Sequence, residues 1–376
     1  MKGPQHQSPG LRVFALPWGN AIKKNSTPEG LNKTPAKCAT PPGLDNLFSR
    51  FPRVARIRAT LGFDVKPPSG FSPKAVPRLF TSAALLLLAG CFNDCKCTFP
   101  PEFTLAHAED TLALVQKFCE ENPSRDSGTA AALAAAKWIR SHAFPFPEVS
   151  TRLDTFTDDT PNGPLEFHNV LTELPAKNKN APWIVLVSHY DTKSGIPGFV
   201  GANDGASSTA LLMILRKLLA NHENLPFNFL FAFLDGEECQ VAYGPNDGLH
   251  GSKRLARQIK DEGRNVRAVI VLDMIGDAYL HVKIPANCTP DLRARALEAA
   301  NKAGTRGHFS LSRGAVLDDH VPFLELGFPA IDFIDFDYGP GNTYWHTAED
   351  TPDKLSAESF HVIAKTVLQL IAGLVE

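Results

Sequence analysis

Two adjacent glutamates, Glu237 and Glu238, follow directly on the segment FAFLDG, in which four apolar residues precede an Asp-Gly pair. Like charges placed side by side cost free energy unless a positive group lies beside them. An acidic pair at the end of a buried strand therefore predicts a bound cation. One glutamate would bind the cation, and the other would remain beside it to move protons.

Other side chains that could bind the same cation follow three further apolar segments. These segments are APWIVLVSHYD, RAVIVLDMIGD and FPAIDFIDFDY, and a loop with the sequence VGANDGAS follows the first of them. Histidine nitrogens and carboxylate oxygens suit a divalent cation of the zinc type. A single histidine or acidic residue usually packs or faces solvent, but the same chemistry at several strand ends favours a metal site. The additional candidates are His189, Asp191, Asp204, Asp273 and His346.

The elements that must position these residues alternate between strand and helix from about residue 103 onward. Four continuous apolar segments predict buried strands, and the segments between them have helical periodicity. The alternation predicts a single α/β domain with a mixed, mostly parallel, twisted central sheet and helices on both faces. In such sheets ligands bind at the carboxyl ends of the strands. Strands are expected at 181–191, 227–238, 267–277 and 328–338, and helices at 106–121, 127–143, 205–221, 249–263, 289–304 and 356–376.

The composition is that of an ordinary globular protein. The chain has 376 residues, of which 43% are hydrophobic and 21% charged, and its formal net charge is -2. No basic excess indicates a nucleic-acid partner. Seven cysteines in a chain of this length do not make a disulfide framework. They are Cys38, Cys91, Cys95, Cys97, Cys119, Cys239 and Cys288.

The first hundred residues differ from the rest. Residues 1–73 are rich in Pro, Gly, Lys and Arg without apolar periodicity, which predicts a disordered or mis-assigned N-terminal extension. Residues 74–91 combine basic residues with an apolar stretch that ends Leu-Ala-Gly-Cys. The stretch is shorter than the roughly 20 residues that span a bilayer. It resembles a lipoprotein-type signal peptide with a lipobox.

That resemblance implies lipidation at Cys91, a tether over 92–102 and a catalytic domain over 103–376. The expected location is then the bacterial cell envelope, with a lipid anchor and a periplasmic or surface-facing domain. Signal peptides begin at the N-terminus, so this interpretation also implies a start codon downstream of Met1. The alternative is a buried Leu-rich helix that ends in Gly-Cys.

Five short motifs in the catalytic domain resemble the M28 family of zinc peptidases. They are SHYD, VGANDGAS, DGEE, LDMIG and WHT, in this order. In the two-zinc aminopeptidases of that family, Glu237 matches the general base and Asp204 the ligand that bridges two metals. The resemblance implies as the other ligands His189, Glu238, Asp273 and His346.

Longer segments resemble the glutaminyl-peptide cyclotransferases, or glutaminyl cyclases, within the same superfamily. They are HYDTK, DGEE, DGLHGSKRLA, DDHVPFLELGFPA and YWHT. The resemblance implies a single zinc, with Glu237 as proton shuttle and Asp273 and Asp318 as a supporting acidic network. The zinc ligands would be Asp204, Glu238 and His346, and the substrate pocket would include Trp345, Tyr243, Asp319 and Asp332. Tyr243 stands where that family has a second pocket tryptophan.

Three functions remain open from the sequence. The first is a cyclase that converts the N-terminal Gln of peptides to pyroglutamate with ammonia release, using one Zn²⁺. The second is an aminopeptidase that removes N-terminal residues with a metal-activated water, using two Zn²⁺. In both, the partners are peptide or protein N-termini. The third is a lipid-anchored binding protein without activity, which the complete set of expected ligands disfavours.

Overall fold

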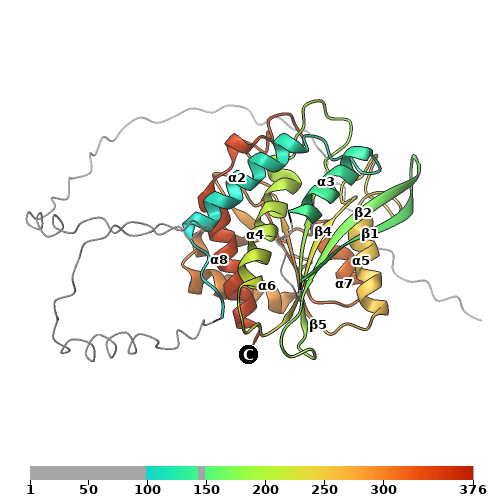
Figure 1. Cartoon of the computed structure of the whole chain (residues 1–376). Coiled ribbons are helices and arrows are strands. Elements are labelled where there is room, and N and C mark those ends of the chain that lie inside the picture. Colours follow the sequence, from blue (N-terminus) through green and yellow to red (C-terminus); the bar gives the residue numbers. More distant parts are fainter. Residues whose placement is uncertain (1–98, 143–148, 376) are drawn as a thin grey trace, which may run out of the picture. The chain divides into compact units, whose positions relative to one another are not determined.

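The computed structural model describes residues 99–142 and 149–375. The predicted extension, signal peptide and lipidation site at Cys91 lie outside the described residues, as does most of the tether. Phe103, where the catalytic domain was expected to begin, is buried in the core. Figure 1 shows the described residues in colour.

A six-stranded sheet forms the centre of the domain, with the order β1-β2-β4-β3-β5-β8. The pairs β3–β4, β3–β5 and β5–β8 are parallel, whereas β1–β2 and β2–β4 are antiparallel. The predicted mixed, mostly parallel sheet is therefore confirmed. The strands are β1 (Ser150–Thr160), β2 (Gly163–Leu174), β3 (Trp183–His189), β4 (Asn228–Leu234), β5 (Val266–Asp273) and β8 (Ala330–Ile334), and a separate pair joins β6 (Val282–Ile284) to β7 (Phe309–Leu311).

Apolar side chains on both faces of the sheet explain why helices cover both. Along β3, Ile184 and Leu186 belong to one apolar cluster, and Val185 and Val187 belong to the other. Successive side chains of a strand point to opposite faces, so a strand buried on both sides must be apolar throughout. This is the reason that APWIVLV has no polar alternation.

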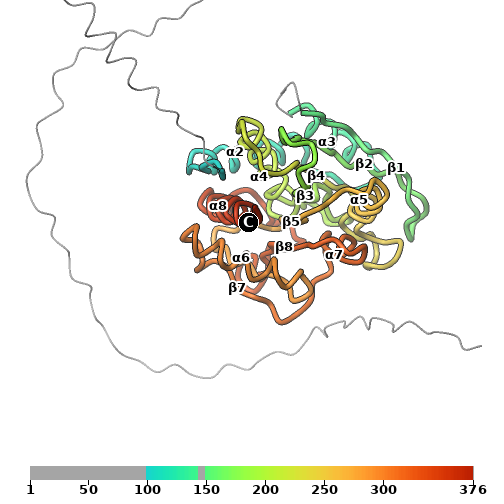
Figure 2. The backbone as a smooth tube through the Cα atoms, turned by 90° about the horizontal axis from the view of Figure 1, so that it is seen from below, coloured from blue at the N-terminus to red at the C-terminus, as the bar shows by residue number. Residues whose placement is uncertain are grey.

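The helices divide between these two clusters, as Figures 1 and 2 show. Residues of α2, α3, α4, α6 and α8 contribute to the larger cluster, and residues of α5 and α7 to the smaller. The predicted helices on both faces are thus confirmed. The bounds are α2 (Leu105–Glu121), α3 (Ala130–Ser141), α4 (Ser208–Ala220), α5 (His250–Asp261), α6 (Pro290–Ala303), α7 (His320–Glu325) and α8 (Ala357–Gly373).

The hairpin of β1 and β2 was not predicted from the sequence. Its strands pair from Ser150 with Glu173 to Thr160 with Gly163, around the turn Pro161-Asn162. Pro, Asn and Gly between two β-rich segments are a turn signal that would have revealed it. The hairpin extends the sheet beyond β4, and the parallel strands β4, β3, β5 and β8 form the rest of the sheet up to its other edge.

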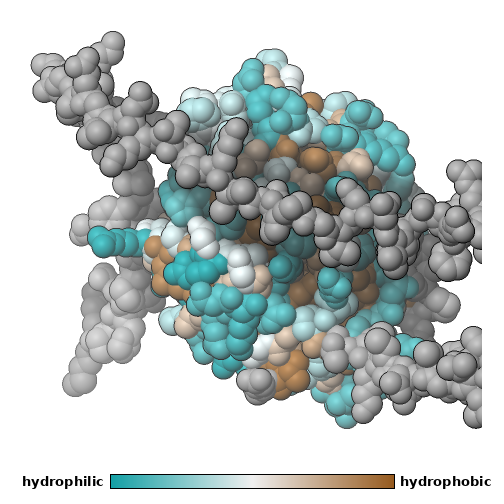
Figure 3. All heavy atoms as spheres, turned by 90° about the vertical axis from the view of Figure 1, so that its left-hand side faces the viewer, coloured by the Kyte–Doolittle hydropathy of each residue, from teal (hydrophilic) through white to brown (hydrophobic). Residues whose placement is uncertain are grey.

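Figure 3 shows the face on the left of Figure 1, where hydrophilic side chains surround smaller apolar areas. A hollow of about 770 Å³ is lined by Phe103, Leu218, Lys302, Lys365 and other residues, before the start of α2, near the ends of α4 and α6 and along the middle of α8. None of the predicted site residues lines this hollow. Within the described residues, no helix has the length and apolar character to cross a membrane.

Candidate metal site

The predicted metal ligands converge at one edge of the sheet. The parallel strands β3, β4 and β5 run in the same direction, so their carboxyl ends meet there. His189 and Asp273 are the last residues of β3 and β5, and Glu237 and Glu238 follow β4 by a short turn. The convergence predicted from the strand ends is therefore present in the fold.

Asp204 lies between two groups of ligand atoms. Its Oδ1 is 3.2 Å from His189 Nε2, and its Oδ2 is 3.2 Å from His346 Nε2. Asp273 Oδ1 is 3.2 Å from the same nitrogen of His189, and Glu238 Oε1 is 2.9 Å from His346 Nε2. Within each group, the ligand atoms lie within 4.8 Å of one another. The groups are His189, Asp204 and Asp273, and Asp204, Glu238 and His346.

The electrostatics of these groups fit a cation. Burial alone would lower the pKa of His346, but its contacts with Asp204 and Glu238 raise it to about 10. Burial likewise opposes protonation of His189, but Asp273, Asp191 and Asp204 raise its pKa well above the usual range. Protons on the two histidines thus balance the buried carboxylates. A divalent cation bound to the same nitrogens would replace those protons and balance the same charge.

A kinked turn directly before α4, η1 (Ala202–Ser207), presents Asp204, whose own backbone is not helical (φ -83°, ψ 94°). The carboxylate of Asp350 accepts hydrogen bonds from the backbone N–H groups of Asn203 and Asp204, at 2.7 and 3.1 Å. Gly205 has φ +93°, and a Cβ there would lie 3.1 Å from His189 Cε1. Only glycine allows this left-handed turn and the close approach of the imidazole. The position of Asp204 thus depends on residues on both sides of it.

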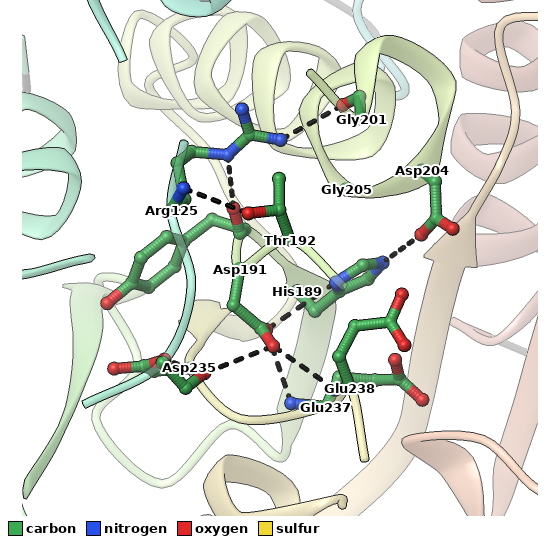
Figure 4. Close-up of polar contacts among 12 residues, drawn as sticks. Arg125, His189, Asp191, Thr192, Gly201, Asp204, Gly205, Asp235, Glu237 and Glu238 are labelled. Atoms are coloured by element: carbon green, nitrogen blue, oxygen red, sulfur yellow. Dashed lines mark hydrogen bonds and ion pairs between the residues drawn. The ribbon is translucent and has the colours of Figure 1, made fainter. Parts of the chain in front are cut away.

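Arg125 is a second support of this loop, and no role for it was predicted from the sequence. Its guanidinium is fully buried and donates hydrogen bonds to the carbonyl oxygens of Asn122, Tyr190, Val200 and Gly201. It therefore joins the end of α2 to the end of β3 and to the loop before Asp204, as Figure 4 shows in part. In the sequence, the only sign of a structural role for Arg125 is that it precedes a Gly-containing loop, at Gly128.

Asp191 holds the glutamate pair. Figure 4 places it between His189 and the backbone of Glu237 and Glu238. Its two carboxylate oxygens accept hydrogen bonds from the N–H groups of Glu237 and Glu238, at 3.2 and 3.1 Å. Asp191 Oδ1 also lies 3.6 Å from His189 Nδ1, on the side of the imidazole opposite the ligand nitrogen.

Glu237 belongs to neither group of ligand atoms. It is 5% exposed, and burial together with the neighbouring Glu238 raises the pKa of its carboxyl well above the usual range. Its Oε1 accepts a hydrogen bond of 2.9 Å from Tyr243 Oη. A buried carboxyl beside the ligands but outside their group can take and release a proton.

Lys193 is a positive side chain beside the glutamate pair that the sequence did not single out as a site residue. Its Nζ lies 3.6 Å from Glu238 Oε2 and donates to the carbonyl oxygen and the sulfur of Cys239. It is the last residue of the HYDTK motif, which is the signal that could have identified it. Lys193 offsets part of the paired negative charge, and a bound cation would offset more of it.

Aromatic side chains surround His346. Trp345 stacks on its imidazole with ring centroids 4.1 Å apart, and Phe199 approaches edge-on at 6.0 Å. His346 has φ +52°, a backbone conformation that histidine rarely adopts. In this conformation His346 contacts both rings and the carboxylates of Asp204 and Glu238. The pocket role of Trp345 stays a prediction.

The structure brings Asp318, Asp319 and Asp332 together, and each is at most 2% exposed. Asp318 and Asp319 lie near enough to Glu237 to raise its pKa. Burial raises the pKa of all three carboxyls. Burial disfavours the charged form of a carboxyl, so the three form a buried acidic cluster. Their predicted supporting and pocket roles stay predictions.

His320 completes a third group of ligand types with Asp318 and Asp332, but its tautomer disfavours a metal. Asn287 is fixed by both backbone groups of Val316, so its amide nitrogen points at His320 Nε2, 2.9 Å away. Burial lowers the pKa of His320 to about 4. The neutral ring accepts at Nε2 and carries its hydrogen at Nδ1, facing Asp332.

Comparison with known proteins agrees with this geometry. Residues 169–371, more than half of the chain, match peptidase family M28. A mouse (Mus musculus) protein named glutaminyl-peptide cyclotransferase-like protein is 31% identical over 250 residues, which cover 58% of this chain and 64% of that protein. The crystal structure of a glutaminyl cyclase from an Acidobacteriales bacterium has a TM-score of 0.68 and 33% identity, and the match covers 74% of this chain and 97% of that chain.

The chain belongs to peptidase family M28. The similarity to glutaminyl cyclases confirms the resemblance predicted from the longer motifs. The chain spans less than two thirds of the length of the mouse relative. A leucine aminopeptidase precursor from Bacteroides thetaiotaomicron shares the fold at a TM-score of 0.63 and 24% identity, with 72% of this chain and 97% of that chain covered. The fold alone therefore does not choose between the two chemistries.

Proposed function

We propose that this protein is a zinc-dependent glutaminyl-peptide cyclotransferase, which converts the N-terminal Gln of peptides to pyroglutamate and releases ammonia. One observation carries the proposal: Glu237 is a buried carboxyl that lies beside the group of Asp204, Glu238 and His346 without belonging to it. The similarity to proteins named glutaminyl cyclases supports the same substrate class.

The reaction joins the substrate's α-amine nitrogen to its own γ-carboxamide carbon and breaks the bond from that carbon to the amide nitrogen. Glu237 takes a proton from the attacking amine and passes it to the leaving nitrogen, so that ammonia departs. General acid–base help of this kind is worth roughly 10² to 10⁴-fold. When bound to the three ligands, zinc supplies a Lewis acid that polarises the carboxamide carbonyl. Trp345 and Tyr243 are proposed to hold the compact substrate conformer.

A second candidate is an M28 aminopeptidase with two zinc ions. The group of His189, Asp204 and Asp273 supports it, because its ligand atoms lie as close together as those of the first group. In that reaction Glu237 would take a proton from water instead of from the substrate amine. The two candidates therefore differ in the number of zinc ions that the active protein binds, which is one for the cyclase and two for the aminopeptidase.

The test is a zinc titration of the metal-free protein with two assays at each step. One assay measures ammonia and pyroglutamate from a Gln-initiated dipeptide, and the other measures hydrolysis of a leucine amide. We expect cyclisation that saturates at one zinc per chain and is lost in Glu237→Gln. The matched control is Glu298→Gln, because the Glu298 side chain is 63% exposed on α6.

Leucine amide hydrolysis that needs a second zinc, without pyroglutamate, would replace the proposal with the aminopeptidase. Zinc binding with neither activity would favour a binding protein on the same fold.

We also propose that the protein is attached to the bacterial cell envelope through a lipid on Cys91. The support is the sequence of residues 74–91 alone, because they lie outside the described residues. Mass spectrometry of the protein expressed in a bacterium tests this. Processing at Cys91 with a diacylglycerol-sized mass increase, absent in Cys91→Ser, is expected. An unprocessed chain would contradict the proposal.

A further inference from the structure

The loop that follows the glutamate pair is held at its far end by one carboxylate. Asp247 is 3% exposed and accepts hydrogen bonds from three successive backbone N–H groups. These belong to Gln240, Val241 and Ala242, at 2.6, 2.9 and 2.8 Å. A carboxylate that accepts three N–H groups fixes the backbone around it, and charge-assisted bonds of this type are among the stronger ones in proteins. The segment that carries Tyr243 is therefore closed into a rigid turn.

A lysine of α5 holds the same turn from outside. Lys253 Nζ donates to the carbonyl oxygens of Gly244, Pro245 and Gly248, at 3.0, 3.1 and 2.8 Å. One cation thus satisfies three carbonyl groups of the turn, and its own helix packs on the sheet. Together with Asp247, Lys253 leaves the backbone on either side of Tyr243 little freedom to move.

The ring of Tyr243 lies close to the backbone at Gly248. Gly248 has φ +78°, and a Cβ there would stand 2.5 Å from Tyr243 Cδ1. Any other residue would push the ring away. The backbone N–H of the next residue, Leu249, donates to the carbonyl oxygen of Glu237 at 2.9 Å. The same short backbone segment therefore fixes both Tyr243 and Glu237.

This arrangement directs the hydroxyl of Tyr243 toward Glu237. Tyr243 Oη lies 2.9 Å from Glu237 Oε1. Tyr243 is 38% exposed as a whole, but partial desolvation and the charge of Glu237 raise its pKa well above the usual range, so the hydroxyl keeps its hydrogen and donates it. Among the described residues, no other side chain forms a hydrogen bond with the Glu237 carboxylate, which leaves Oε2 free.

We propose that Tyr243 is a positioning residue for the reaction, whose hydroxyl fixes the carboxylate of Glu237 so that Oε1 is held and Oε2 faces the substrate proton. The inference rests on the proposed function only in requiring that Glu237 moves a proton, and it holds equally for cyclisation and for aminopeptidase hydrolysis. The inference assigns one role to the ring of Tyr243 and another to its hydroxyl. The ring serves as a pocket wall, which any aromatic residue could supply, whereas the hydroxyl acts on Glu237.

The kinetic test compares Tyr243→Phe with Tyr243→Leu in the zinc-loaded protein. Removing the hydroxyl while keeping the ring is expected to lower kcat by about 10-fold or more and to leave KM within about twofold, since a hydrogen bond to a charged group is worth roughly that factor. Removing the ring as well should also raise KM. The control is Tyr279→Phe, because Tyr279 is 89% exposed. A Tyr243→Phe enzyme with unchanged kcat would overturn the inference.

Crystal structures of the zinc-loaded wild type and Tyr243→Phe give a readout that needs no activity. We expect one orientation of the Glu237 carboxylate in the wild type, and a rotated or divided orientation in the variant. An identical single orientation in both would refute the positioning role even if the protein were inactive in both assays. Inactive wild type with the expected change at Glu237 would instead count against the proposed function alone.

Discussion

Replacing Arg125 by lysine is expected to destabilise the protein and to weaken metal binding, although Arg125 is not a ligand. Its side chain is fully buried and binds carbonyl oxygens on three separate segments. One of these segments leads into the loop of Asp204, and another is the end of β3 next to His189. Losing these hydrogen bonds should therefore change the positions of both ligands, Asp204 and His189.

The magnitude follows from the number of bonds. The guanidinium donates to four carbonyl oxygens, those of Asn122, Tyr190, Val200 and Gly201. An ammonium has its three donors on one atom and cannot match the spread of a planar fork. Losing two bonds from a charged donor, each worth about 1.5 kcal/mol, lowers the free energy of unfolding by about 3 kcal/mol. Misorienting the residues that support a ligand typically weakens metal affinity by about 10 to 100-fold.

Urea denaturation of the metal-free protein and competition with a chromophoric zinc chelator measure the two effects. The matched control is Arg254→Lys. Arg254 also makes two hydrogen bonds, to Asp154, but its side chain is 45% exposed. An exposed pair of this kind is worth at most about 1 kcal/mol. If Arg125→Lys were no more destabilising than Arg254→Lys, the reasoning from buried hydrogen bonds would be refuted.

Three further outcomes are expected at the site. Gly205→Ala should weaken zinc affinity, because the new Cβ would lie 3.1 Å from His189 Cε1 at a φ of +93°; an unchanged affinity in the chelator assay would contradict this. The metal-free protein should lose stability as pH rises from about 6.5 through about 10. The pKa of His346 is about 10 in the fold against 6.5 ordinarily, so its stabilising contribution is complete below 6.5 and disappears above 10. Thermal melts over this range should show the loss without zinc and a much smaller one with zinc, and a flat metal-free profile would count against the charge balance. Trp345→Leu should raise KM for the Gln-initiated dipeptide more than it lowers kcat, because the ring stacks on His346 without touching Glu237; steady-state kinetics with an unchanged KM would argue against a pocket role.

The fold class and the ligand positions could be predicted because both depend on local patterns. A strand buried on two faces must be apolar throughout, and IVLV before His189 has this property. The polar residues that end such a strand lie at the sheet edge whatever the loops do. The hairpin of β1 and β2 was missed because its alternating pattern is weaker, although Pro161 and Asn162 mark its turn.

Residues that act through several segments could not be predicted in the same way. Arg125 binds carbonyl groups as far away as Gly201, and Asp350 binds the backbone at Asp204 from 146 residues away in sequence. Nothing in the neighbouring sequence of either residue specifies these partners, since carbonyl and amide groups occur at every position.

The sequence by itself determined which chemical groups this protein has: the paired glutamates, the two histidines and the aspartates at the ends of apolar strands. Only the tertiary structure decided which of these groups lie together as possible metal ligands and which lie outside them. It placed Asp204 between two ligand groups, kept Glu237 outside both, and brought the hydroxyl of Tyr243 to 2.9 Å from Glu237. The reason is physical. Strand ends follow from local hydrophobicity, but the direction of a side chain follows from hydrogen bonds and packing between segments that are distant in the sequence.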